Sequence, residues 1–226
     1  MNSALLDRIE VNPSEKPAAT IIWLHGLGAD GHDFEAIVPE LRLPDSIPVR
    51  FVFPHAPERS VTINAGMIMR AWFDLIDLDL GANSADKEQF LESVEMLEAL
   101  IENEMRFGLD SDRIVLAGFS QGGAVALHTG LHYPKRLAGI LAMSMHLPTL
   151  RDRSAALSPV NREVPIMMAH GQMDPVIPLA KAIATRQELT RLGYAVSWHE
   201  YPIQHSVCAA EVADIRAWLM GVLARK

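Results

Sequence analysis

The chain has 226 residues, of which 49% are apolar and 21% are charged, and this composition suits one globular domain over residues 1–226. Its formal net charge of −8 argues against nucleic acid or an anionic membrane surface as the main partner. Its single cysteine, Cys208, cannot form an internal disulfide, and no apolar run is long enough to span a membrane. Because the first ten residues carry charges where a signal peptide needs an apolar core, we predict a cytoplasmic protein without stable membrane insertion.

The first buried strand is predicted over residues 20–24, after a segment that suits an edge strand, and a helix is predicted over 34–41. Between them lies a glycine-rich loop in which Gly26, Gly28 and Gly31 have the spacing of a dinucleotide-binding fingerprint. That fingerprint also needs an acidic residue near the end of the next strand, to hold a ribose hydroxyl.

The next predicted strand, 49–53, ends in Pro54-His-Ala-Pro57 and offers no acid there. The glycine loop is therefore better explained as a source of backbone donors, and a nucleotide-dependent oxidoreductase is the weaker alternative.

Residues 58–83 are too irregular for one element, and a loop rich in Met, Trp and Phe either covers a core or lines a pocket. From this loop we predict Trp72 as a substrate-binding residue.

An amphipathic helix is predicted next, ending before Gly108. Its apolar stripe has spacings of three and four and consists of Phe90, Val94, Leu97, Ile101 and Met105. The opposite face carries glutamates that are most simply a solvated surface, Glu92, Glu95, Glu98 and Glu102.

The most informative stretch is 113–127. An apolar run over 114–117 predicts a buried strand, a helical pattern begins after Ser120, and Gly118-Phe-Ser-Gln-Gly122 between them matches G-x-S-x-G in its strand–turn–helix context. Glycines are needed there because the turn that raises the serine brings strand and helix too close for a Cβ. The pattern favours Ser120 as a nucleophile over an ordinary glycine-rich turn.

Further alternation of strands and helices follows, with a polar surface connection over 151–163. Strands are predicted over 137–143, 165–169 and 196–201, and helices with inward residues at 179–189 and 212–222. This alternation predicts an α/β fold with a mostly parallel sheet and helices on both faces.

A serine nucleophile needs a histidine base, which in turn needs a carboxylate to orient it. His205 follows the last predicted strand, and Asp174 follows the one before it. The order Ser120, Asp174, His205 is the one expected of the α/β-hydrolase arrangement. Two other strand-end histidines, His25 and His170, lie beside glycines and are better explained as hydrogen-bonding groups in turns.

Acyl transfer also needs donors for the negative charge that develops on the carbonyl oxygen. One donor is predicted to be the backbone amide of Gln121, directly after the nucleophile. The other is predicted to be the amide of Leu27, because the flanking glycines let that backbone turn inward.

At this point the sequence resembles the phospholipase/carboxylesterase group of α/β-hydrolases, which includes acyl-protein thioesterases and small bacterial carboxylesterases. The resemblance extends from about Thr20 onward and rests on six segments: 23–30, 54–57, 70–74, 118–123, 170–178 and 201–206. It implies an α/β-hydrolase fold, Ser120, Asp174 and His205 as a catalytic triad, and Leu27 and Gln121 as oxyanion donors. It also implies hydrolysis of carboxylic esters or acyl thioesters through an acyl-enzyme, with no metal and no cofactor.

One segment departs from the family pattern. After the strand-end serine, where the family usually has a small residue, this chain has Met145-His146-Leu147. Since that loop borders the acyl site in relatives, we predict these three residues to bind substrate, a small-molecule ester or an acylated partner. A non-catalytic α/β-hydrolase-fold binding protein stays an alternative, and the sequence leaves a homodimer open.

Overall fold

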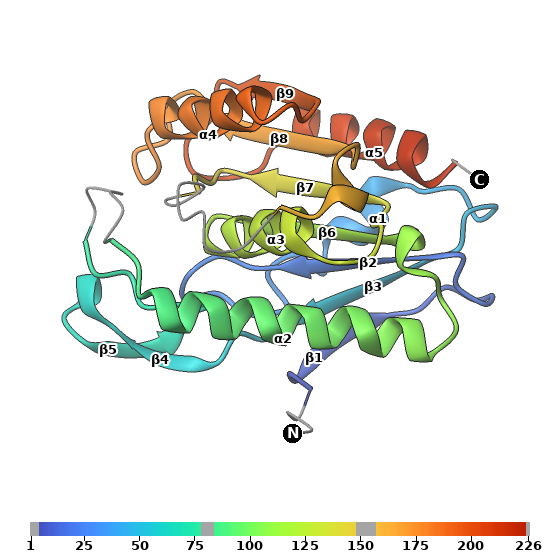
Figure 1. The fold of residues 1–226 in the computed structure, drawn as a ribbon, viewed down its shortest axis with the longest axis horizontal. Helices are drawn as coiled ribbons and strands as arrows, with labels where there is room; N and C mark the ends of the chain where they lie inside the picture. The colour runs from blue at the N-terminus through green and yellow to red at the C-terminus, as the bar shows by residue number, and fades with distance from the viewer. Residues whose placement is uncertain (1–4, 78–83, 148–156, 225–226) are drawn as a thin grey trace.

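A seven-stranded sheet forms the centre of the structure, in the order β1-β3-β2-β6-β7-β8-β9 (Figure 1). The computed structural model describes residues 5–77, 84–147 and 157–224. Only β1 runs antiparallel to its neighbour, so the mostly parallel sheet predicted from the sequence is confirmed. The strands are β1 (Arg8–Val11), β2 (Ala19–Leu24), β3 (Val49–Pro54), β6 (Ile114–Phe119), β7 (Gly139–Met143), β8 (Ile166–Gly171) and β9 (Val196–Tyr201).

Helices cover both faces of this sheet, as the alternating sequence pattern predicts. In Figure 1, α2, α3 and α4 lie in front of the sheet, and α1 and α5 lie behind it. The helices are α1 (Ile37–Leu41), α2 (Lys87–Arg106), α3 (Gln121–His132), α4 (Leu179–Arg191) and α5 (Ala209–Leu223). No helix in the described ranges is both long and apolar enough to cross a membrane.

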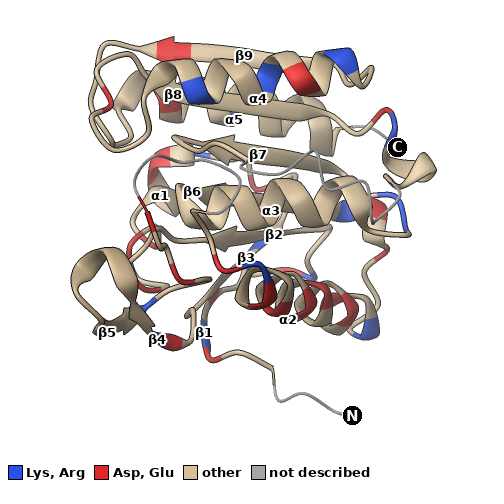
Figure 2. Ribbon diagram, turned by 60° about the vertical axis from the view of Figure 1, so that its left-hand side comes forward, with Lys and Arg blue, Asp and Glu red and all other residues tan. Residues whose placement is uncertain are grey.

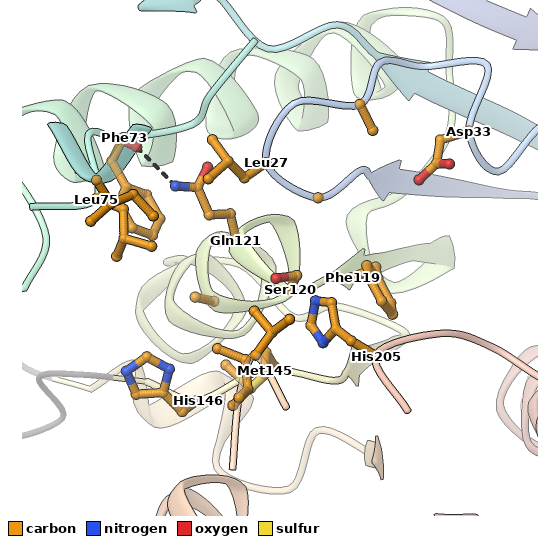
Figure 3. Close-up of a pocket in the computed structure, with 16 residues that line it drawn as sticks. Leu27, Asp33, Phe73, Leu75, Phe119, Ser120, Gln121, Met145, His146 and His205 are labelled. Carbon is orange, nitrogen blue, oxygen red and sulfur yellow. Dashed lines mark hydrogen bonds between the residues drawn. The ribbon is translucent and has the colours of Figure 1, made fainter. Parts of the chain in front are cut away.

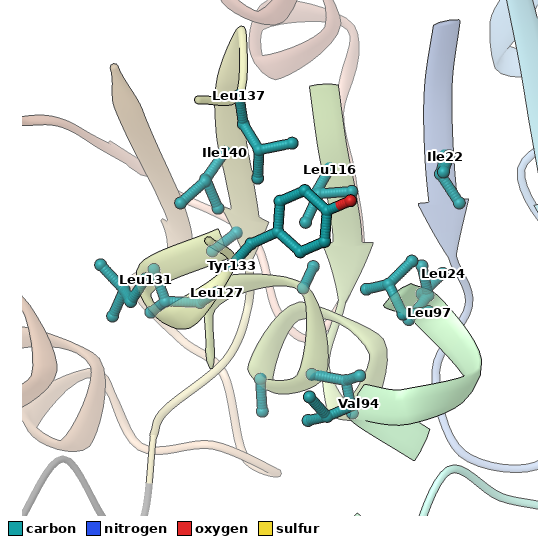
Figure 4. Packing of buried hydrophobic residues seen from close by; sticks show 14 of the residues in the cluster. Ile22, Leu24, Val94, Leu97, Leu116, Leu127, Leu131, Tyr133, Leu137 and Ile140 are labelled. Atoms are coloured by element: carbon teal, nitrogen blue, oxygen red, sulfur yellow. The ribbon is translucent and has the colours of Figure 1, made fainter. Parts of the chain in front are cut away.

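The central strands are buried on both faces, which is why they appear as continuous apolar runs in the sequence. Successive side chains of a strand point to opposite faces, so alternate residues enter two separate cores. Ile22 and Leu116 pack with α2 and α3 on one side (Figure 4), whereas Trp23 and Val115 pack with α1 and α5 on the other.

Two predicted elements differ from those observed. The helix predicted over 34–41 is shorter, because residues 31–36 form turns and α1 begins only at Ile37. Much of the irregular stretch 58–83 is a two-stranded hairpin of β4 (Glu58–Val61) and β5 (Met67–Arg70). Residues 78–83 of that stretch, and residues 151–156 of the connection predicted over 151–163, lie outside the described residues.

The glutamate face of α2 is visible as a row of acidic residues in Figure 2. Glu92 pairs with Arg59 and Glu102 with Lys135, so two of the predicted solvated glutamates also form surface ion pairs. A further acid of this helix, Glu104, is buried, where it accepts a hydrogen bond from the Thr20 hydroxyl at 2.9 Å.

Candidate active site

Ser120 occupies a strained turn between β6 and α3. Its φ of 54° and ψ of −120° are unusual for a residue with a side chain. A Cβ on Gly118 would lie 2.3 Å from the Gly122 carbonyl oxygen, and one on Gly122 would lie 2.5 Å from the His25 carbonyl oxygen. Both glycines of the motif are therefore required by backbone crowding, as the sequence argument expects.

His205 and Asp174 form a hydrogen-bonded pair behind the serine. The Nδ1 of His205 lies 2.7 Å from Oδ2 of Asp174, and Figure 3 shows the His205 ring beside Ser120. The other carboxylate oxygen of Asp174 accepts the amides of Val176 and Ile177, each at 2.8 Å. Because Nδ1 donates its proton to the carboxylate, Nε2 of His205 keeps a lone pair and can act as a base.

The loops after β8 and β9 are fastened together, which fixes the His205–Asp174 pair. The amide of Gln172 donates to the Tyr201 carbonyl and the amide of Met173 to the Ile203 carbonyl. A Cβ on Gly171 would lie 2.2 Å from the Gln204 carbonyl oxygen, so only glycine allows this approach. This rigid contact holds the two loop residues in a fixed mutual geometry.

His170, at the end of β8, lies under the same loop. Its Nε2 lies 2.9 Å from the carbonyl oxygen of Ile177 and 3.5 Å from Oδ2 of Asp174. Burial lowers the pKa of His170, so we take the ring as neutral and the hydrogen bond to Ile177 as its main contact. The predicted role in a turn fits this geometry.

His25 has the corresponding place at the end of β2. Its Nε2 accepts the Ala56 amide at 3.0 Å, and its Nδ1 lies 2.7 Å from the Gly26 carbonyl oxygen. Since Nε2 must accept, the proton is on Nδ1, which donates to Gly26. Burial lowers the pKa of His25 to about 4, so the ring is neutral at physiological pH.

The glycine loop after β2 holds Leu27 in the cavity that also contains Ser120. The Gly28 amide donates to the Arg70 carbonyl at 2.8 Å, with Gly28 at a φ of 78°. At its far end, a Cβ on Gly31 would lie 2.4 Å from the Phe53 carbonyl oxygen. Gly31 packs against β3, Gly28 is bonded to β5, and α1 begins only at Ile37, so the loop lacks the helix start that a dinucleotide fingerprint requires.

Gln121 connects the serine turn to the segment after β5. Its side chain accepts the Trp72 amide at 3.1 Å and donates to the Phe73 carbonyl at 2.9 Å. As the first residue of α3, Gln121 has a backbone amide without an acceptor inside the helix. That amide is the one predicted to hold the oxyanion.

The prediction that Trp72 binds substrate is corrected by its position in the structure. The side chain is fully buried, its Nε1 donates to the His25 carbonyl at 2.8 Å, and it is not part of the cavity surface. A buried indole needs an acceptor for its N–H, and here that requirement ties residues 71–73 to the end of β2. Phe73 and Leu75 line the cavity instead, and no pattern in the sequence distinguishes them from their neighbours.

The Met145-His146-Leu147 segment is divided between two roles. Met145 and His146 line the cavity, whereas Leu147 does not. The Leu147 amide donates to the Thr185 hydroxyl at 3.0 Å and its side chain is 8% exposed, so its predicted substrate contact is corrected to packing near α4. Ser144, at a φ of 45°, makes the turn that sends its two successors inward.

A cavity of about 340 Å³ unites these residues. Its surface is mostly apolar, and Ser120, His205, Leu27 and Gln121 meet in it. The other lining residues are Gly26, Ala29, Asp33, Ile63, Phe73, Leu75, Phe119, Ala124, Met145, His146, Val176 and Ile177. Across the described ranges, no group of three or more His, Cys, Asp or Glu side chains could hold a metal ion.

Comparison with known proteins decides the family. The phospholipase/carboxylesterase family model matches residues 7–223. The chain belongs to this family. The structure also superposes on the crystal structure of Arabidopsis thaliana SOBER1 with a TM-score of 0.85 and 30% identity, over 91% of this chain and 99% of that one.

Other members of the phospholipase/carboxylesterase family are similar over most of their length. Acyl-protein thioesterase 1 of Gibberella zeae is 34% identical over 234 residues, covering 100% of both chains. The Neurospora crassa protein of the same name is 40% identical, over 89% of this chain and 85% of its own. The predictions of an α/β-hydrolase fold and of a serine hydrolase of this family are confirmed.

Proposed function

We propose that this phospholipase/carboxylesterase family member hydrolyses carboxylic esters or acyl thioesters through an acyl-enzyme on Ser120. The observation that carries the proposal is the 2.7 Å hydrogen bond from His205 to Asp174, beside a serine on a glycine-enforced elbow. Similarity to proteins named acyl-protein thioesterase supports the substrate class.

In the first half of the reaction, Ser120 Oγ attacks the acyl carbon while Nε2 of His205 takes the hydroxyl proton. Asp174 stabilises the resulting imidazolium through Nδ1, and the amides of Leu27 and Gln121 donate to the oxyanion. The bond to the leaving group then breaks, and His205 returns its proton to the departing alkoxide or thiolate.

In the second half, His205 takes a proton from water, whose oxygen attacks the acyl carbon. The tetrahedral intermediate expels Ser120, which regains its proton from His205, and the carboxylic acid leaves. The apolar residues Phe73, Leu75 and Met145 suit the acyl chain. We further propose that the enzyme works in the cytoplasm, which its acidic charge and single cysteine support.

The test combines Ser120→Ala with the matched control Ser197→Ala, which removes an exposed hydroxyl from β9. We expect wild type and Ser197→Ala to cleave p-nitrophenyl butyrate and to bind a fluorophosphonate covalently, and Ser120→Ala to do neither. Mass spectrometry should place the adduct on the Ser120 peptide. A folded wild-type protein without ester or thioester turnover would instead support the non-catalytic binding alternative.

A further inference from the structure

The cavity has two chemically different sides. Phe73 and Leu75 lie on one side of Ser120, and the carboxylate of Asp33 lies on the other (Figure 3). An acyl chain accounts for the apolar side. It gives no reason for a carboxylate in the same cavity, because a negative charge next to an acyl chain would disfavour binding.

Asp33 is not neutralised by a neighbour. Within the described ranges, no hydrogen bond or ion pair joins its carboxylate to another residue, although its amide donates to the Asp30 carbonyl at 3.1 Å. Asp33 is exposed overall, but partial desolvation at the cavity still raises the pKa of its carboxyl, and the negative charge of Asp30 adds to the effect. A positive charge placed beside Asp33 would relieve both costs.

We assign the leaving group to the side of the cavity on which His205 and Asp33 lie, to the right of Ser120 in Figure 3. In the proposed mechanism His205 protonates the leaving group, so that group must pass His205. The rings of His205 and Phe119 are 4.7 Å apart, and those of Phe119 and Phe34 are 5.7 Å apart. This row of rings leads from the catalytic base to the residue that follows Asp33 in the chain.

We propose that Asp33 selects substrates whose leaving alcohol or thiol carries a positive charge. The proposal rests on the ester or thioester hydrolysis proposed above. The net charge of −8 would add a weaker, long-range attraction for the same substrates. An Asp33 that only stabilises its turn would produce no such selectivity.

The decisive substrates are butyrylcholine and 3,3-dimethylbutyl butyrate, which have nearly the same shape and differ by the charge of one atom. A pH-stat gives kcat/KM for both esters. We expect wild type to prefer the cationic ester by about five-fold, the size of an exposed ion pair. Asp33→Asn should remove this preference by slowing the cationic ester alone, and added salt should weaken it in wild type.

Glu35→Gln is the matched control, because Glu35 is an acid two residues away that does not line the cavity. It should keep the wild-type preference. Equal ratios in wild type and Asp33→Asn would exclude a small cationic alcohol as the leaving group, and an equal loss in Glu35→Gln would overturn the proposal. Hydrolysis of the neutral ester separates these results from failure of the proposed function, in which neither ester is cleaved.

A second pair of substrates identifies the source of the charge. S-butyryl-cysteine peptides with either Lys or Gln after the acylated residue present the cation on a peptide instead of a small alcohol. Preference for the Lys peptide that Asp33→Asn removes would support a basic peptide, and preference in the choline pair alone would support a small amino alcohol. Absence of a preference in both pairs would overturn the proposal.

Discussion

The loops that follow β2 and β8 begin in the same way and end with different chemistry. Each is preceded or opened by a His-Gly pair, His25-Gly26 directly after β2 and His170-Gly171 as the last two residues of β8, and both histidines are buried and bonded to a backbone carbonyl. The first loop carries Leu27 and the second carries Asp174.

The difference lies in what each loop leaves available. His25 uses both ring nitrogens on backbone groups, and its loop presents a backbone amide at Leu27. His170 holds Ile177, and its loop presents a carboxylate to His205. In both loops a neutral buried histidine at a strand end fixes the backbone, and the function of the loop depends on which residue is held in place.

Asp174→Asn should have the largest effect, lowering kcat by roughly 10³- to 10⁵-fold, because His205 loses its orienting charge. The matched variant in the other loop is Asp30→Asn, since Asp30 also caps its turn by accepting the His32 amide at 2.8 Å. Asparagine can still accept there, so we expect a change of a few-fold at most. Comparable losses in both variants, measured with p-nitrophenyl butyrate, would show that the loops do not differ as described.

Replacing the Leu27 amide by an ester should have the next largest effect. Nonsense suppression with the α-hydroxy acid analogue of leucine deletes the N–H and keeps the side chain. We expect kcat to fall by about 10²- to 10³-fold, the usual cost of one oxyanion donor. Leu27→Ala, which keeps the amide, should be mild. A greater loss of kcat in Leu27→Ala, together with a lower Tm, would assign Leu27 to packing.

The pH dependence of stability should distinguish His25 from an ordinary histidine. Burial lowers its pKa to about 4 from 6.5, so between these values the unfolded chain binds a proton that folded His25 does not. The free energy of unfolding should therefore fall as the pH drops from 6.5 to 4, by at most about 3 kcal/mol from this residue.

Glu211 changes the free energy of unfolding with pH in the opposite direction to His25. Burial raises its pKa to about 7, so its stabilising contribution is greatest at low pH and is lost as the pH rises through 7. Urea denaturation of wild type and His25→Gln from pH 4 to 7.5 isolates the histidine term, because both proteins contain Glu211. The wild-type curve should be steeper between pH 4 and 6.5. If the wild-type and His25→Gln stability curves were parallel, His25 would bind protons equally in the folded and unfolded states.

The smallest predicted effect is the difference between the stability lost on removing His25 and that lost on removing His170. His25→Ala removes two hydrogen bonds to the backbone and His170→Ala removes one, so the first should be more destabilising by about 1 kcal/mol. Urea denaturation followed by circular dichroism measures the difference, with the exposed His32→Ala as a control that changes little. Greater destabilisation by His170→Ala would reverse the proposed ranking.

The sheet was predictable because its strands are continuous apolar runs and its helices carry regular stripes. The Ser120 turn was predictable because backbone crowding demands glycines at Gly118 and Gly122, which a sequence records directly. The positions of Asp174 and His205 directly after their strands were also informative, because parallel strands end at one edge of a sheet.

Side-chain direction after irregular backbone was not predictable. Trp72 and Phe73 are adjacent buried aromatic residues, and the hydrogen bond from the Trp72 indole to the His25 carbonyl holds Trp72 away from the cavity that Phe73 lines. Leu147 likewise follows two cavity residues and turns away because its amide meets Thr185 across the fold. Such long-range partners leave no periodic signal in the sequence.

The strained backbone of Ser120 has a consequence for engineering. A residue with a side chain at a φ of 54° and a ψ of −120° costs about 1–3 kcal/mol, and glycine would avoid most of that cost. A library selected for heat resistance alone would therefore enrich glycine at this position and discard the proposed nucleophile. Evolution of a thermostable variant of this enzyme must select for turnover in every round.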